Sequence, residues 1–183
     1  MKFRIVMLFA FTIVFTSCKD EVLPKPKAML RLDFPRTYYK KLSTQNFVFD
    51  MNNNAKIKAQ NEAGLTIDYP KIKGAIYITY KKVGKDLNTL LIDTQRLSYE
   101  HATKADNIVE QPFINPEKEV YGMFYEVTGN AASQAQFYVT DSINHFVTGS
   151  LYFYAKPNYD SIYPAANYLQ KDIRRIMESM EWK

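Results

Sequence analysis

The chain has 183 residues, with 24 Lys and Arg residues against 19 Asp and Glu residues and a formal net charge of +5. This weak basic balance is spread along the chain without a long basic run, so charge gives no reason to expect nucleic acid as a partner. The single cysteine excludes an intramolecular disulfide and a zinc site built from several cysteines.

Residues 1–17 have the parts of a secretory signal peptide: a basic start, an apolar run over residues 5–15 and small residues before Cys18. The apolar run is shorter than the roughly 20 residues that a membrane span needs. Residues 15–18 resemble the lipobox of bacterial lipoproteins, although Phe15 stands where leucine is usual. We therefore expect cleavage before Cys18 and acylation of that residue, with palmitate among the acyl chains. The alternatives are a plain signal peptide with a chance cysteine, and an uncleaved anchor.

Residues 18–33 are predicted to carry the lipid and to form a tether. Prolines and lysines alternate in this segment, which favours an extended chain and excludes a helix. The tether is interpreted either as a spacer or as a docking motif for a partner. Its central residues are Pro24, Lys25, Pro26 and Lys27.

Short alternating runs at residues 47–49, 65–69 and 74–80 predict three strands, with a polar loop over residues 51–64. Residues 86–105 then change to helical periodicity, with Asp86 placed as the N-cap. The stripe predicted to be buried comprises Leu87, Leu90, Leu91, Thr94, Leu97, Ser98, His101 and Ala105. With no second ligand or catalytic partner beside it, His101 is interpreted as a packed histidine.

Four further strands are predicted at residues 107–114, 119–128, 133–140 and 145–154, with a turn at Gly129-Asn130. The last two strands form an antiparallel hairpin. In the last strand, one predicted face comprises Val147, Gly149, Leu151 and Phe153, and the other comprises Thr148, Ser150, Tyr152 and Tyr154.

A final helix is predicted from about Ser161, and Trp182 is expected to pack back on the core. Its apolar stripe is Ala165, Leu169, Ile173, Ile176 and Met180, and its solvated face is Lys171, Asp172, Arg174, Arg175 and Glu178. Residues 34–183 thus form a single α+β domain, a curved and mostly antiparallel sheet packed with two amphipathic helices. The predicted order of three strands, a helix, four strands and a helix is similar to that of PsbP-like domains.

Motifs that carry chemistry are nearly absent from the sequence. No glycine-rich phosphate loop or His-x-x-x-His pair occurs, and nothing singles out a pair of carboxylates. Asp141, Ser142 and His145 lie close together and could form a hydrolase triad, but they are also ordinary residues of a hairpin turn. We expect a protein that is not an enzyme and that has no cofactor and no bound metal.

Several segments together resemble the gliding-motility lipoprotein GldD family of Bacteroidota, over nearly all of the chain after the signal peptide. They are residues 22–27 with 30–32, Ile67-Asp68-Tyr69-Pro70, residues 76–80, Tyr99-Glu100-His101-Ala102-Thr103-Lys104-Ala105-Asp106, residues 129–134, Thr140-Asp141-Ser142, His145-Phe146 and residues 149–153. The resemblance implies a role in gliding motility and in the linked type IX secretion machinery, and it carries over no catalytic residues. It also implies a lipid-anchored protein of the cell envelope, either facing the periplasm or exposed at the surface.

On this resemblance, we expect the domain to support assembly or stability of an envelope complex through protein contacts. The candidate contact residues are Pro24, Lys25, Pro26, Lys27, Arg31, Gly129 and Asn130, which match the family and are predicted to be exposed. The alternative is a membrane-tethered module with no motility role that binds a small ligand, peptide or glycan on an aromatic sheet face that includes Tyr152 and Tyr154.

Overall fold

The computed structural model describes residue 34, residues 36–156 and residues 158–183. The elements in this part of the chain follow in the order β1 (Tyr39–Ser43), β2 (Phe47–Asn52), β3 (Lys56–Asn61), β4 (Gly64–Tyr69), β5 (Gly74–Lys82), α2 (Leu87–Tyr99), η1 (Glu100–Thr103), β6 (Ala105–Asn115), η2 (Pro116–Lys118), β7 (Val120–Gly129), β8 (Ser133–Thr140), β9 (His145–Phe153), α3 (Tyr159–Ser179) and β10 (Glu181–Trp182).

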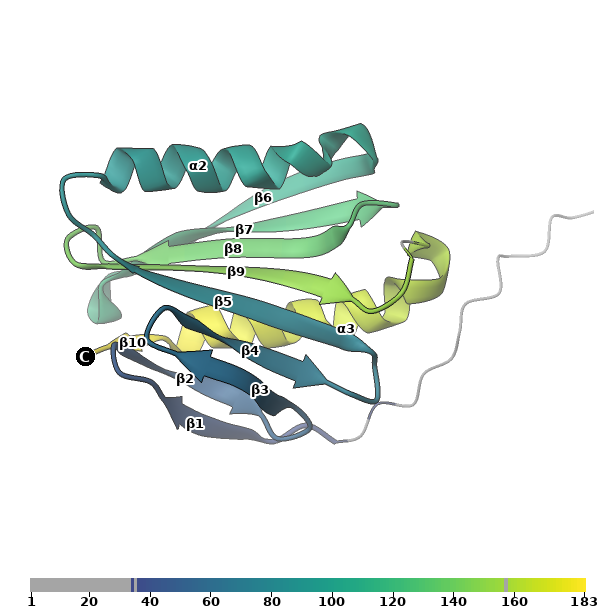
Figure 1. The fold of residues 1–183 in the computed structure, drawn as a ribbon, viewed down its shortest axis with the longest axis horizontal. Helices are drawn as coiled ribbons and strands as arrows, with labels where there is room; N and C mark the ends of the chain where they lie inside the picture. The colour runs from purple at the N-terminus through teal and green to yellow at the C-terminus, as the bar shows by residue number, and fades with distance from the viewer. Residues whose placement is uncertain (1–33, 35, 157) are drawn as a thin grey trace, which may run out of the picture.

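The larger sheet has seven strands in the order β3-β4-β5-β9-β8-β7-β6, and every neighbouring pair is antiparallel (Figure 1). Because side chains alternate along a strand, each central strand has two different faces. We call the face toward α3 the inner face; Ile76, Phe137 and Leu151 lie on it and are buried. We call the opposite face, on which α2 lies, the outer face.

Helix α3 joins this sheet to a smaller one of three strands, β1-β2-β10. It contacts β2 on one side and β7 and β8 on the other. The predicted apolar stripe of α3 is confirmed, because Ala165, Leu169, Ile173 and Ile176 are all buried. Burial of a leucine or isoleucine side chain contributes about 1.5–3 kcal/mol to folding. Because the core that includes Leu169, Ile173 and Ile176 also contains residues of both sheets, it stabilises both of them.

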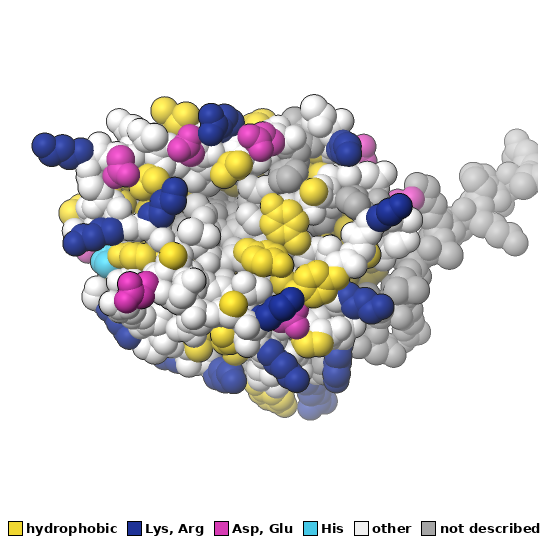
Figure 2. All heavy atoms as spheres, viewed as in Figure 1, with side chains coloured by type: hydrophobic (Ala, Val, Ile, Leu, Met, Phe, Trp, Pro, Cys, Tyr) yellow, Lys and Arg dark blue, Asp and Glu magenta, His cyan; other side chains and the backbone are white. Residues whose placement is uncertain are grey.

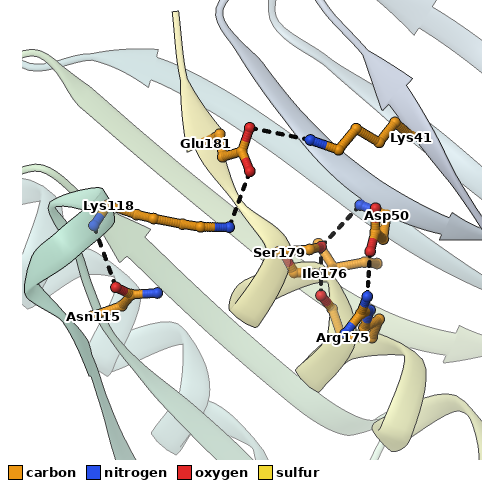
Figure 3. A network of polar contacts seen from close by, with 8 residues as sticks. All are labelled: Lys41, Asp50, Asn115, Lys118, Arg175, Ile176, Ser179 and Glu181. Atoms are coloured by element: carbon orange, nitrogen blue, oxygen red, sulfur yellow. Dashed lines mark hydrogen bonds and ion pairs between the residues drawn. The ribbon is translucent and has the colours of Figure 1, made fainter.

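Polar contacts close the smaller sheet around the C-terminus (Figure 3). Glu181 of β10 accepts hydrogen bonds from Lys118 at 3.0 Å and from Lys41 at 3.4 Å. The contact with Lys118 lowers the pKa of Glu181. Asp50 of β2 pairs with Arg175, and its backbone N–H donates to the Ser179 hydroxyl at 2.8 Å. Since exposed ion pairs add little stability, these contacts mainly fix how β10 and α3 meet β1 and β2.

The predicted class, α+β with two helices and mostly antiparallel sheet, is confirmed, but the predicted element order is wrong. Five strands precede α2, and β10 follows α3. The predicted loop over residues 51–64 contains the end of β2 and all of β3, and β1 was missed. Both missed strands are edge strands with mostly exposed side chains, so neither shows a clear apolar alternation. The likeness to PsbP-like domains rested on the predicted order and stays a prediction.

Three predictions about single residues are also corrected. Asp86 stands at the N-cap of α2, but its carboxylate accepts a hydrogen bond from Gly84 N instead of capping the helix. Leu97 is 52% exposed, while Leu90, Thr94 and Ser98 form the buried stripe of α2. Asp172, predicted to be solvated, is buried.

Among the residues described, neither helix is both long enough and apolar enough to cross a membrane.

Candidate functional site

The outer face of the seven-stranded sheet carries a polar floor where its central strands meet. Register pairs Thr79 of β5 with Thr148 of β9, and Ser150 of β9 with Gln136 of β8. These four side chains therefore lie next to one another on the outer face. The predicted division of the last strand into two faces is confirmed at Val147 and Leu151, which are buried in the core on the inner face.

Helix α2 is attached to this face mainly through its N-terminal half. Leu90 packs with Val83 and Phe146 in a small buried cluster, which Leu87 and Leu91 extend. Toward its C-terminal end the contact is polar: the Ser98 hydroxyl lies 3.0 Å from Gln136 Oε1 and 3.1 Å from the Thr94 carbonyl oxygen. The helix thus has an apolar attachment at one end and a hydrogen-bonded one at the other.

A cavity of about 300 Å³ lies between α2 and the sheet. The sheet contributes the polar floor, Lys81 and Tyr152, and the helix contributes Asp93, Thr94 and Leu97. A second hollow of about 280 Å³ continues over β5 toward the β3–β4 hairpin and shares Thr79 with the first. We call the two together the α2 groove.

Tyrosines form one rim of the α2 groove. Tyr77 and Tyr152 make an edge-to-face contact with ring centroids 5.7 Å apart, and Tyr77 is 41% exposed. Beside them, the Tyr154 hydroxyl donates to Asp68 at 2.7 Å, and Lys58 lies over its ring. Figure 2 shows hydrophobic side chains gathered on this part of the surface, below α2. The hydrogen bond to Asp68 raises the pKa of Tyr154, and burial raises that of Tyr152, so both hydroxyls keep their protons at neutral pH.

Of the three candidate triad residues in the β8–β9 turn, Asp141 and His145 have side chains with structural partners. Asp141 Oδ1 accepts hydrogen bonds from the backbone N–H groups of residues 143, 144 and 145, which help to hold its pKa below the usual value despite the opposing effect of burial. The His145 ring lies 3.0 Å from the Tyr80 hydroxyl and stacks on Trp182. These contacts account for Asp141 and His145 as turn and packing residues. That the protein is not an enzyme stays a prediction.

Asp172 lies at the centre of a buried polar cluster that the sequence did not predict. Its carboxylate accepts hydrogen bonds from Tyr39 at 2.8 Å and from Asn52 at 2.6 Å, and Tyr69 also donates to it. Asn52 further donates to the Tyr168 hydroxyl at 3.0 Å. The cluster fastens β1 and β2 to α3, and burial raises the pKa of Asp172. We interpret it as a structural cluster.

Comparison with protein families decides which family this chain belongs to. The model of the gliding motility lipoprotein GldD family matches residues 19–182. The chain belongs to this family. No curated protein matches the chain significantly.

Membership in the GldD family implies a role in gliding motility and a lipid-anchored position in the cell envelope. The predicted lipidation site, Cys18, lies directly before the matched segment and outside the described residues. Pro24, Lys25, Pro26, Lys27 and Arg31, which were predicted to contact partners, also lie outside the described residues.

The other two predicted contact residues of this GldD-family chain lie at the end of β7, where Gly129 is the last residue of the strand and Asn130 follows it. Gly129 is buried with a positive φ of 94°, so the prediction that it is exposed is wrong, although the turn there is confirmed. A Cβ at this position would press against Asp106. Asn130 is exposed, and its side-chain oxygen accepts a hydrogen bond from Tyr159 N at 2.8 Å. Asn130 therefore caps the start of α3, which is a structural role.

The His101 side chain lies outside the part of the structure that is described, so its predicted packing stays a prediction. The α2 groove was predicted only through its tyrosines. The residues that α2 contributes to the groove are brought there by the path of the helix across the sheet. Residue spacing does not predict that path.

Proposed function

We propose that this protein acts in gliding motility and in the linked type IX secretion machinery as a lipid-anchored envelope component that binds protein partners. On this proposal Cys18 carries the lipid, and the domain supports the assembly or stability of a complex at the membrane without catalysing a reaction. Two or more acyl chains would anchor it stably, because one chain binds a bilayer only weakly.

One surface feature supports the partner-binding role. Pro112 pairs with Met123, and Ile114 with Tyr121, so four apolar side chains lie together on the outer face of β6 and β7. Ile114 is 71% exposed, and Pro112 is also exposed. We call these four residues the β6–β7 strip. Contiguous exposed apolar surface of this kind typically marks a site of protein association.

The strip lies at the edge of the seven-stranded sheet, where β6 has only one neighbour. Pro112 in the edge strand has no N–H to offer to an added strand, which disfavours strand-to-strand association at that point. We therefore expect a partner to cover the side chains of the strip rather than extend the sheet.

The experiment is deletion of the gene in the source organism, scored for colony spreading and for secretion of type IX cargo. We expect both to be lost and to be restored by the wild-type gene but not by Cys18→Ala. Ile114→Glu should also fail to restore them, whereas Ile143→Glu should restore them. Ile143 is the matched control because it is 69% exposed, in the β8–β9 turn. Normal spreading and secretion after deletion, or full rescue by Ile114→Glu, would contradict the proposal.

The tether remains a second candidate for partner contact. Replacing Lys25 and Lys27 with glutamate should weaken co-purification of partners without changing the melting temperature of the domain. An unchanged co-purification profile would restrict partner binding to the folded domain.

A further inference from the structure

The surface that α2 covers is unusual for a helix packed on a sheet. Such a helix normally buries apolar side chains of the sheet below it. Here the sheet side of the groove carries Thr79, Gln136, Thr148 and Ser150 beside Phe137 and Phe146, and Phe146 belongs to the apolar attachment around Leu90. A row of polar side chains beside an incompletely covering helix is better suited to a polar ligand than to helix packing.

The donors of this floor are held in place. Gln136 is almost fully buried, and its Oε1 lies 3.0 Å from the Ser98 hydroxyl, so its amide is fixed in one orientation. Thr148 and Ser150 stand on β9, which has a strand on each side. Hydroxyls and amides on such rigid strands can both donate and accept hydrogen bonds, as a ligand rich in hydroxyl groups requires.

The rim adds a second type of contact. Tyr77 and Tyr152 meet edge to face, so the two rings present differently oriented surfaces beside the floor. Aromatic faces next to hydrogen-bonding groups match a sugar ring, which has apolar C–H faces and hydroxyl groups at its edge. We propose that the α2 groove binds an oligosaccharide, stacked on Tyr77 and Tyr152 and hydrogen-bonded to the floor.

The same surface disfavours other ligands. An extended peptide usually adds to a free strand edge. Strands β5, β9 and β8, which form the floor, are paired on both sides, and the free edge of β3 borders only the second hollow. A lipid chain would cover the hydroxyls of Thr79, Thr148 and Ser150 without offering them hydrogen-bond partners, which costs free energy. The charged groups that line the cavity, Lys81, Asp93 and Glu100, are of both signs, which favours a ligand without strong net charge. The second hollow, which Tyr77 lines, gives room for more than one sugar unit.

The test is calorimetric titration of the full-length protein in detergent micelles with the tetramers of N-acetylglucosamine and of glucose. We expect at least one of them to bind, and Tyr77→Ala and Tyr152→Ala each to weaken that binding by about tenfold or more. Tyr163→Ala should leave binding unchanged. Tyr163 is the matched control because it also makes an edge-to-face contact, with Tyr159 on α3.

A second pair of variants separates ligand contact from folding. Thr148→Val and Ser150→Ala remove floor hydroxyls with little change in shape, so they should weaken binding while leaving the melting temperature unchanged or higher. The proposal is overturned if neither tetramer binds below about 10 mM, or if binding is insensitive to the tyrosine variants. It is also overturned if a synthetic peptide of residues 19–33 occupies the groove and the tetramers do not. Because the β6–β7 strip does not include groove residues, failure here leaves the partner-binding proposal standing.

Discussion

Asp172 shows how one residue can differ from the pattern of its element. In the amphipathic helix α3, Asp172 is followed by one apolar and two basic residues, and this pattern predicted an exposed position. Only 2% of the Asp172 surface is exposed. The helical pattern predicts the direction in which the Asp172 side chain leaves α3, but it does not predict where β2 lies. Asn52 of β2 lies opposite Asp172 and donates a hydrogen bond to it. A burial of this kind follows from tertiary packing, and residue spacing could not predict it.

The pKa of Asp172 gives a prediction about stability. Burial raises this pKa above 3.8, although hydrogen bonds from Asn52, Tyr39 and Tyr69 oppose the rise. The folded protein therefore takes up a proton on Asp172 at a higher pH than the unfolded chain does. The resulting stabilisation is fully present below the unfolded pKa and is lost as the pH rises through the folded pKa.

We expect Asp172→Asn to lower the free energy of unfolding at neutral pH by about 1–3 kcal/mol, because one acceptor oxygen is replaced by an NH₂ group and a buried donor loses its partner. The deficit relative to wild type should grow as the pH is lowered toward about 4. Urea unfolding of both proteins across this range measures it. Asp106→Asn, at an exposed position, is the control. A deficit that does not change with pH would show that Asp172 titrates alike in both states.

At the scale of the element, the two helices differ in how firmly they are held. The buried stripe of α3 packs between two sheets, whereas α2 lies on one sheet through a small apolar cluster and the Ser98–Gln136 hydrogen bond. Local opening requires the loss only of an element's own contacts. Helix α2 should therefore open more readily than α3.

Amide hydrogen exchange tests this difference. In the wild-type protein, amides of α2 should exchange faster than those of α3. Leu90→Ala removes the centre of the α2 attachment, and we expect it to speed exchange in α2 further, at a cost of about 2 kcal/mol, while α3 stays protected. Ile92→Ala should have little effect, because Ile92 is 64% exposed on the same helix. Equal protection of α2 and α3 in the wild-type protein would contradict this account.

Sequence patterns predicted some elements better than others for a physical reason. Strands β4, β5 and β9 bury alternate side chains over much of their length, so their periodicity reveals them. Strand β8 is buried along nearly its whole length, so its apolar content reveals it instead. Strands β1 and β3 are mostly exposed edge strands, and β10 has only two residues. The groove was harder still to predict, since Tyr152 and Gln136 come together only through the sheet register, and Leu97 only through the path of α2.

At the scale of the whole molecule, the question is whether two sheets unfold as one unit. Trp182 lies where they meet: it pairs with Phe47 of β2, stacks on His145 of β9 at 5.1 Å, and donates from Nε1 to the Glu119 carbonyl at 3.0 Å. Helix α3 supplies buried side chains to one core that includes residues of both sheets. Loss of either sheet would expose side chains of α3 that are buried in this shared core, which favours a single cooperative transition.

Trp182 is the only tryptophan of the chain, so its fluorescence reports on the junction alone. We expect the urea transition followed by this fluorescence to coincide with the one followed by far-ultraviolet circular dichroism, which reports on all strands and helices. A Trp182→Phe protein provides the blank for tyrosine emission. If the fluorescence changed at a lower urea concentration than the circular dichroism, the smaller sheet would be shown to detach first. Helix α3 would then be anchored mainly to β7 and β8, and the contacts around Glu181 would be too weak to couple the two sheets.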